Sequence, residues 1–299
     1  MAHPNAETIA AVLNGAVDLY AALRTLGTQG IAPIPQIIAA CDATTAARLA
    51  ALDAEVLAAV LRRGAGQPAI ANAAAIRTHL AALRTSPLFL PNIAQSRSMA
   101  LPTEGKLPDM PAFSDRAFDG WFEAQAHGAL LYGLGAYGER RSVYKTPQFA
   151  DAGSPERRTV HLGIDVFAPA MTPVYAPIAG TVLYVTYNAD PLDFGHTLIL
   201  QHDADDIPFY SLYGHLAKTL PDLLRVGDTV APGQHIAHLG DWHENGGWAA
   251  HVHFQIMSTM LQQNGGFFFA VGHESLLDVW SDIVLDPNLA LKIPTNRFV

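Results

Sequence analysis

Hydrophobic residues recur at helical spacing in the first third of the chain. In residues 6–26 they fall at steps of three and four positions, and Gly27 follows as a plausible C-terminal stop. The segments 44–63 and 69–84 repeat this pattern, and alanine fills many of the remaining positions. The pattern predicts a small bundle of closely packed, Ala-rich helices over residues 1–85.

The next segment, residues 86–139, predicts an irregular connector with one helix in it. Prolines interrupt its first half and break any regular period. The helix is expected over residues 114–131, with Ser114 as its N-cap.

The texture of the chain changes from about Tyr144 onward. Short runs of Val, Ile, Leu and Tyr alternate with Gly, Pro and Asp, which is typical of antiparallel strands joined by turns. The expected strand regions are 173–185, 197–202, 209–215, 229–236 and 251–257. We therefore expect an α+β protein, in which residues 140–260 form an antiparallel β domain with a groove and residues 261–299 pack on it as an extension.

Composition and charge exclude several classes of function. The net charge of -9 argues against a nucleic-acid partner, and the pairs Arg62-Arg63, Arg140-Arg141 and Arg157-Arg158 are interpreted as solvated loop or helix ends. Cys41 is the only cysteine, which excludes an intrachain disulfide and a Cys-rich zinc cluster. Charged residues make up only 15% of the chain, so we expect extensive buried surface, with a homo-oligomer interface as one place for it.

The expected location follows from the N-terminus and from hydropathy. Residues 1–32 lack a basic n-region, an apolar core and a cleavage site, so they do not predict a signal peptide. No segment approaches the roughly 20 apolar residues of a membrane span. As written, the chain is expected to be cytoplasmic; it would be periplasmic or secreted if a leader is missing.

Most of the 13 histidines follow residue 160, and three groups of them stand out. His161 and Asp165 are four positions apart, and His251 and His253 are two apart, so each pair shares one face of an extended segment. The third group is His215, at the end of an expected strand.

These residue types suit a hydrolytic metal centre. Two histidines and one carboxylate leave a zinc coordination position open, and two further histidines can act as general base and oxyanion stabiliser. Taken singly, each group has an ordinary interpretation as a polar strand face or a surface pair. Their combination and order favour the metal centre, although such ligands accept several divalent ions.

In this order the motifs resemble the lysostaphin/LytM-type zinc metallopeptidases over about residues 140–260. The resemblance implies that His161, Asp165 and His253 bind one zinc ion per chain, and that His215 and His251 are the catalytic histidines. It also implies an endopeptidase that cleaves peptide bonds at small residues, Gly or D-Ala, with peptidoglycan as the default substrate. All five positions are filled here, unlike in the metal-free regulatory members.

Two alternatives to this function are kept open. The chain can be a catalytically silent peptide- or cell-wall-binding regulatory module. It can also be an intracellular hydrolase of a small peptide or amide, because Asn245-Gly-Gly-Trp248 is similar to peptidase-like modules embedded in fused kinase–aminotransferase proteins.

Some features outside these motifs also carry expectations. The helical region either shields the groove and supplies a fourth metal ligand or packs elsewhere. His243 and Trp248 are the best candidates for a cleft lining, and Phe267-Phe268-Phe269 is interpreted as core or interface rather than as a ligand platform.

Overall fold

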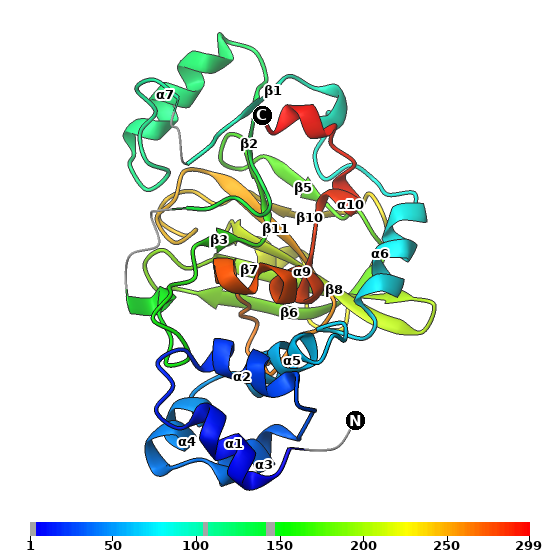
Figure 1. Ribbon diagram of the computed structural model, residues 1–299. Helices are drawn as coiled ribbons and strands as arrows, with labels where there is room; N and C mark the ends of the chain where they lie inside the picture. Colours follow the sequence, from blue (N-terminus) through cyan, green and yellow to red (C-terminus); the bar gives the residue numbers. More distant parts are fainter. Residues whose placement is uncertain (1–3, 104–106, 142–146) are drawn as a thin grey trace.

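The computed structural model describes residues 4–103, 107–141 and 147–299, and it has the expected α+β fold (Figure 1). Its helices are α1 (Ala6–Leu13), α2 (Leu19–Gly27), α3 (Ile34–Ala40), α4 (Ala43–Ala50), α5 (Ala54–Gly64), α6 (Ala73–Ala82), α7 (Ala117–Ala126), α8 (Leu220–Leu223), α9 (Leu277–Ile283) and α10 (Asn288–Leu291). Short 3-10 turns occur at η1 (Ile93–Gln95), η2 (Pro147–Phe149), η3 (Glu274–Leu276) and η4 (Thr295–Arg297). Its strands are β1 (Ser98–Ala100), β2 (Tyr132–Gly135), β3 (Val160–His161), β4 (Ile164–Phe167), β5 (Pro173–Tyr175), β6 (Gly180–Asn188), β7 (Gly195–Ala204), β8 (Ile207–Leu216), β9 (Thr229–Val230), β10 (His235–His238), β11 (His251–Met257), β12 (Val271–Gly272) and β13 (Val284–Leu285).

The N-terminal region is helical, but two of the predicted helices are broken. The segment 6–26 forms α1 and α2, because Gly15 takes a positive φ of 73° and Asp18 then caps α2 with its side chain. The segment 44–63 forms α4 and α5, because Asp53 accepts hydrogen bonds from the first backbone N–H groups of α5. Short polar residues at caps compete with helix continuation, which the hydrophobic period alone does not reveal.

One large sheet organises the rest of the chain. Its strand order is β1-β2-β4-β11-β8-β7-β6-β9, β13 also pairs with β11, and all pairings except β1–β2 are antiparallel. The expected strand over 251–257 is β11, which pairs with both β4 and β8. The sheet therefore draws strands from outside residues 140–260, including β1 and β2 from the proline-rich connector.

The helix expected over 114–131 is shorter than predicted. It is α7, it begins at Ala117, and the side chain of Asp115, not of Ser114, accepts a hydrogen bond from the Ala117 N–H. It ends where His127 adopts the left-handed conformation and Gly128 follows.

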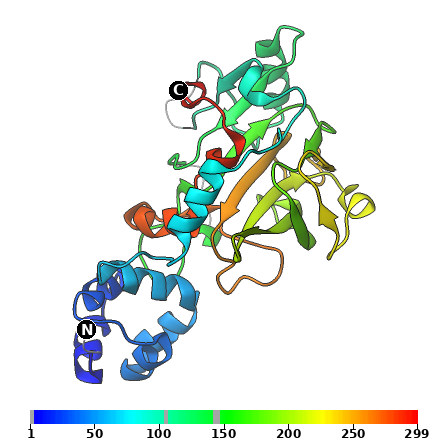
Figure 2. The same cartoon turned by 90° about the vertical axis from the view of Figure 1, so that its right-hand side faces the viewer.

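The N-terminal helices pack against α9 and one face of the sheet, and in Figure 2 they extend below it. Ion pairs connect Arg24 to Asp278 at 2.8 Å and Arg77 to Asp282 at 2.8 Å. Within the described part of the chain, no helix combines the length and the apolarity that crossing a membrane requires.

Candidate metal centre

Pairing of the central strands brings the predicted ligands together. His253 on β11 lies directly opposite Asp165 on β4, and its other neighbour in the sheet is Gly214 on β8. His161 ends β3, and the chain turns through Gly163 before β4 begins. A side chain at Gly163 would place a Cβ 2.4 Å from the His253 ring, so this position has room only for glycine.

Three ligand atoms of these residues converge. His253 Nδ1 lies 3.0 Å from Asp165 Oδ1 and 3.0 Å from His161 Nε2, and His161 Nε2 lies 3.2 Å from Asp165 Oδ1. All three side chains are buried, with exposed fractions of 0–3%. The structure thus brings together the metal ligands that the resemblance implies.

Hydrogen bonds on the far side of each ring determine where the ring protons lie. His161 Nδ1 donates to the Ala136 carbonyl at 2.8 Å, which leaves Nε2 as a lone pair. His253 Nε2 lies 2.9 Å from Gln255 Oε1 and donates to it, which leaves Nδ1 as a lone pair.

The donor set fits a divalent transition metal. Two imidazole lone pairs and a carboxylate oxygen meet with no proton between them, an arrangement that is repulsive until a cation binds. Zinc bonds of about 2.0–2.1 Å separate the ligand atoms of a tetrahedral site by roughly 3.3 Å, close to the separations found here. No other group of three such ligands was found among the described residues.

The electrostatics of the site keep the ligands in their metal-binding forms. Burial lowers the pKa of His161 to about 4, with the Arg141 charge adding to this effect, so its imidazole is neutral at pH 7. Burial alone would raise the pKa of Asp165. The electrostatic interaction with His161, the positive charge of Arg141 and the hydrogen bonds with His161 and His253 outweigh burial and hold this pKa well below its usual range.

Arg141 is a buried part of the site that the sequence pattern missed. It was interpreted as solvated, yet only 4% of it is exposed; its Nη1 donates to Asp165 Oδ2 at 2.7 Å and its Nε to Glu139 Oε2 at 3.0 Å. Arg158, from the pair Arg157-Arg158, also lines the cavity. A burial partner far along the chain is invisible to a local charge pattern.

The structure places His215 and His251 beside the ligands. Their ring centroids are 4.2 Å apart, and His251 Nε2 lies 3.9 Å from Asp165 Oδ1. Each Nδ1 donates at 2.7 Å to a backbone carbonyl, that of Asn245 for His215 and that of Ala249 for His251, so both Nε2 atoms are proton acceptors. Burial lowers the pKa of both rings and keeps them neutral at pH 7.

His215 reaches the site through a strained backbone. Its φ is 62°, a left-handed value that is unusual for a residue with a side chain, and the pairing of β7 with β8 shifts register next to it. Such strain persists where the surrounding structure enforces it, and it is common at functional sites.

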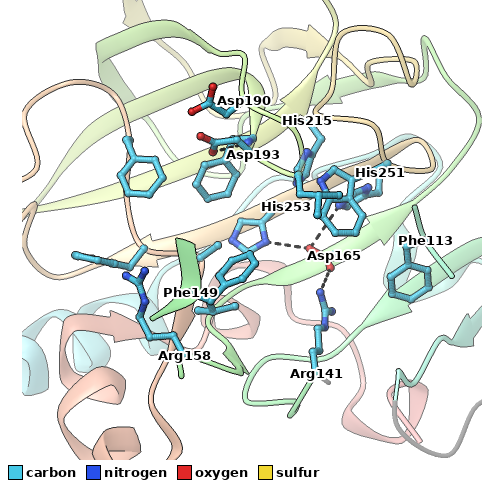
Figure 3. Close-up of a pocket in the computed structure, with 17 residues that line it drawn as sticks. Phe113, Arg141, Phe149, Arg158, Asp165, Asp190, Asp193, His215, His251 and His253 are labelled. Atoms are coloured by element: carbon cyan, nitrogen blue, oxygen red, sulfur yellow. Dashed lines mark hydrogen bonds and ion pairs between the residues drawn. The ribbon is translucent and has the colours of Figure 1, made fainter. Parts of the chain in front are cut away.

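The site opens into a cavity of about 240 Å³ (Figure 3). Its charged lining includes Asp190 and Asp193 at one end and Arg158 at the other. Its aromatic lining consists of Phe113, Phe149, Phe194, Trp248, Phe267 and Phe269. A small, largely apolar cavity with a few convergent polar groups is typical of a ligand site.

This lining corrects two expectations and answers a third. Of the three consecutive phenylalanines, Phe267 and Phe269 line the cavity and Phe268 is core. Trp248 lines the cavity as expected, whereas His243 does not. No described residue before Phe113 contributes to the lining, so the helical region packs elsewhere and supplies no described metal ligand.

Comparison with known proteins agrees with this geometry. Residues 159–265 match the family model of Peptidase family M23. A protein of Haemophilus influenzae described as an uncharacterized metalloprotease is 29% identical over 151 residues, which cover 48% of this chain and 29% of that protein. The chain thus spans less than a third of the length of this curated relative.

Solved structures are also similar in part. A zinc containing peptidase from Vibrio cholerae is 26% identical, with a TM-score of 0.31 over 41% of this chain and 32% of that one. The catalytic domain of lysostaphin from Staphylococcus simulans is 23% identical, with a TM-score of 0.35 over 58% of this chain and 96% of that domain.

The family match covers β3 through β11 and therefore all five residues of the site. The findings support a Peptidase M23 domain of the LytM/lysostaphin type within residues 159–265.

Proposed function

We propose that this protein is a zinc metallopeptidase that hydrolyses a peptide bond in the cavity above His161, Asp165 and His253. The observation that carries the proposal is the convergence of three unprotonated ligand atoms within 3.2 Å of one another. Zinc bound by these atoms supplies a Lewis acid that polarises a peptide carbonyl and acidifies water.

The proton chemistry falls to His215 and His251. Both rings are neutral at pH 7, and each has its Nδ1–H committed to a backbone carbonyl. Each can therefore take a proton only at Nε2, and the imidazolium so formed donates that proton again. The histidine that accepts the proton of the attacking water at Nε2 delivers that same proton to the leaving amine, and the second histidine stabilises the developing oxyanion when its own Nε2 carries a proton.

The cavity supports small residues on either side of the scissile bond. Aromatic rings crowd its walls and leave about 240 Å³, which suits Gly or D-Ala better than bulky side chains. A peptidoglycan cross-bridge and a short cytoplasmic peptide or amide both meet this requirement. We propose the small-residue peptide as the substrate class common to both.

Peptide hydrolysis tests the proposal directly. The zinc-loaded protein is incubated with pentaglycine and with D-Ala-containing peptides, and the products are identified by mass spectrometry. His251→Ala and His215→Ala are expected to reduce the rate roughly 100- to 10,000-fold, because each removes a proton-transfer group. His235→Ala, on the remote strand β10, serves as the control and should not change the rate.

The silent-module alternative makes the opposite prediction. A zinc-loaded wild type that binds these peptides and cleaves none of them would contradict the peptidase function and support a binding module.

A further inference from the structure

Gln255 lies two positions beyond His253 on β11 and contacts its ring. His251, His253 and Gln255 lie at even offsets on one strand, so their side chains share a face. Gln255 is fully buried, with an exposed fraction of 0%. Its amide therefore has to find its hydrogen-bond partners within the protein.

The amide of Gln255 has one donor and one acceptor end, and its surroundings fix which is which. Its Nε2 donates to the Phe269 carbonyl at 3.0 Å, an acceptor that cannot donate in return. Its Oε1 is thereby turned toward His253 Nε2, 2.9 Å away. An amide oxygen is an acceptor only, so the proton of the neutral imidazole must sit on Nε2.

The consequence lies on the opposite side of the ring. With the proton on Nε2, Nδ1 of His253 carries the lone pair, and Nδ1 is the atom that faces Asp165 and His161 at 3.0 Å. In the other tautomer Nδ1 would carry a proton and could not bind a metal.

Gln255 is unique among the groups that orient the site histidines. His161, His215 and His251 each donate to a backbone carbonyl, which no substitution removes. His253 alone depends on a side chain. The same side chain also bonds the Phe269 carbonyl, so it connects the metal ligand to the aromatic wall of the cavity.

We infer that Gln255 is a positioning residue that holds His253 in its Nε2–H tautomer, and that zinc affinity depends on it. The inference rests on the proposed zinc site, but its tautomer component concerns the metal-free protein as well. Partners that orient metal-binding histidines typically contribute about 10- to 100-fold to metal affinity.

Two substitutions separate the hydrogen bond from the shape of the side chain. Gln255→Met keeps the length of the side chain but removes the acceptor, so zinc should bind roughly 10- to 100-fold more weakly. Gln255→Glu keeps an oxygen that accepts from His253 Nε2 but loses the donor to the Phe269 carbonyl, so it should recover part of the affinity that Gln255→Met loses. Gln201→Met, at an exposed position of strand β7 in the same sheet, is the control for the same change of residue type and should bind zinc as the wild type does.

Two measurements decide the outcome. The zinc dissociation constant is obtained by competition with a chelating dye, and the tautomer of His253 is read from the ¹⁵N shifts of histidine-labelled, zinc-free protein. The signal is assigned by its loss in His253→Asn. The wild type should show a protonated Nε2 and a bare Nδ1, and Gln255→Met should lose this preference.

A Gln255→Met variant with the wild-type tautomer and zinc affinity would overturn the inference. Weaker zinc binding with an unchanged tautomer would also overturn it, because that result assigns Gln255 a purely structural role. A wild type that binds no zinc would remove the proposed function instead, and the ¹⁵N shifts would then decide the role of Gln255 on their own.

Discussion

Gly163 offers a sharp test of the metal site, because it lies between two ligands without binding anything itself. A Cβ at this position would meet His253 Cε1 at 2.4 Å and Nε2 at 2.6 Å, whereas ordinary contacts begin at 3.4 Å. The backbone does not oppose alanine there, since Gly163 is not among the residues with positive φ. Gly163→Ala therefore acts through the His253 ring.

The magnitude follows from this overlap. To accommodate the methyl group, the ring must move by about 1 Å, whereas metal sites tolerate ligand displacements of only about 0.2 Å. Strain of this kind typically costs about 1–3 kcal/mol. Because 1.4 kcal/mol corresponds to a factor of ten in a dissociation constant, zinc should bind roughly 10- to 100-fold more weakly.

The assay is zinc competition with a chelating dye, combined with thermal unfolding of the metal-free protein. Gly120→Ala is the control: no atom lies within 4 Å of its added Cβ, and it sits inside α7. It should leave zinc affinity unchanged and stabilise the helix by up to about 1 kcal/mol. If Gly163→Ala bound zinc as tightly as the wild type, the proposed ligand geometry at His253 would be incorrect.

Three further predictions concern stability. The fold holds His202 neutral, because burial lowers its pKa from 6.5 to about 4; its stabilisation is complete above pH 6.5 and is lost as the pH falls toward 4. Wild type should therefore lose about 3 kcal/mol more unfolding free energy than His202→Asn between pH 7 and pH 4 in urea titrations, and equal losses would contradict this. Asp53 caps α5 and also accepts hydrogen bonds from Gln262 and Gln263. Asp53→Ala should therefore lower the unfolding free energy by about 2 kcal/mol. An unchanged urea midpoint would refute this. Removal of zinc with a chelator should lower the melting temperature, since zinc at 1,000 times its dissociation constant stabilises by about 4 kcal/mol, and a melting temperature insensitive to zinc would count against the site.

The sequence predicts those parts of the site that depend on strand geometry. His251 and His253 share a face because the side chains of a strand alternate, and the strand β11 spans the residues expected for it. In the folded chain, strand pairing places Asp165 opposite His253. From the sequence, that these two residues meet was implied only by the resemblance to the family.

Residues whose role depends on long-range packing could not be predicted in this way. In the sequence, Arg141 belongs to one of several isolated arginine pairs. Only folding brings its Nη1 to 2.7 Å from Asp165 Oδ2. Phe267 and Phe269 were interpreted as core or interface, but in the folded chain they line the cavity. Gln255 did carry a signal, since it continues the period of two that begins at His251.

The broken helices have a different cause. Asn14-Gly15 is a turn pair and Asp18 is a cap residue, and both lie inside a continuous hydrophobic period. The period predicts one helix, whereas the turn and cap residues divide it into two. A local cap that satisfies a backbone N–H ends a helix even where the apolar spacing continues.

Metal content is the measurement that tests the central claim most directly. The purified full chain is incubated with zinc, dialysed, and assayed for bound metal beside Asp165→Ala and His253→Ala. The geometry predicts about one zinc ion per chain in the wild type and its loss in both variants, because each removes one of three converging ligands. A wild type that remains metal-free after exposure to zinc would contradict the proposed metallopeptidase function.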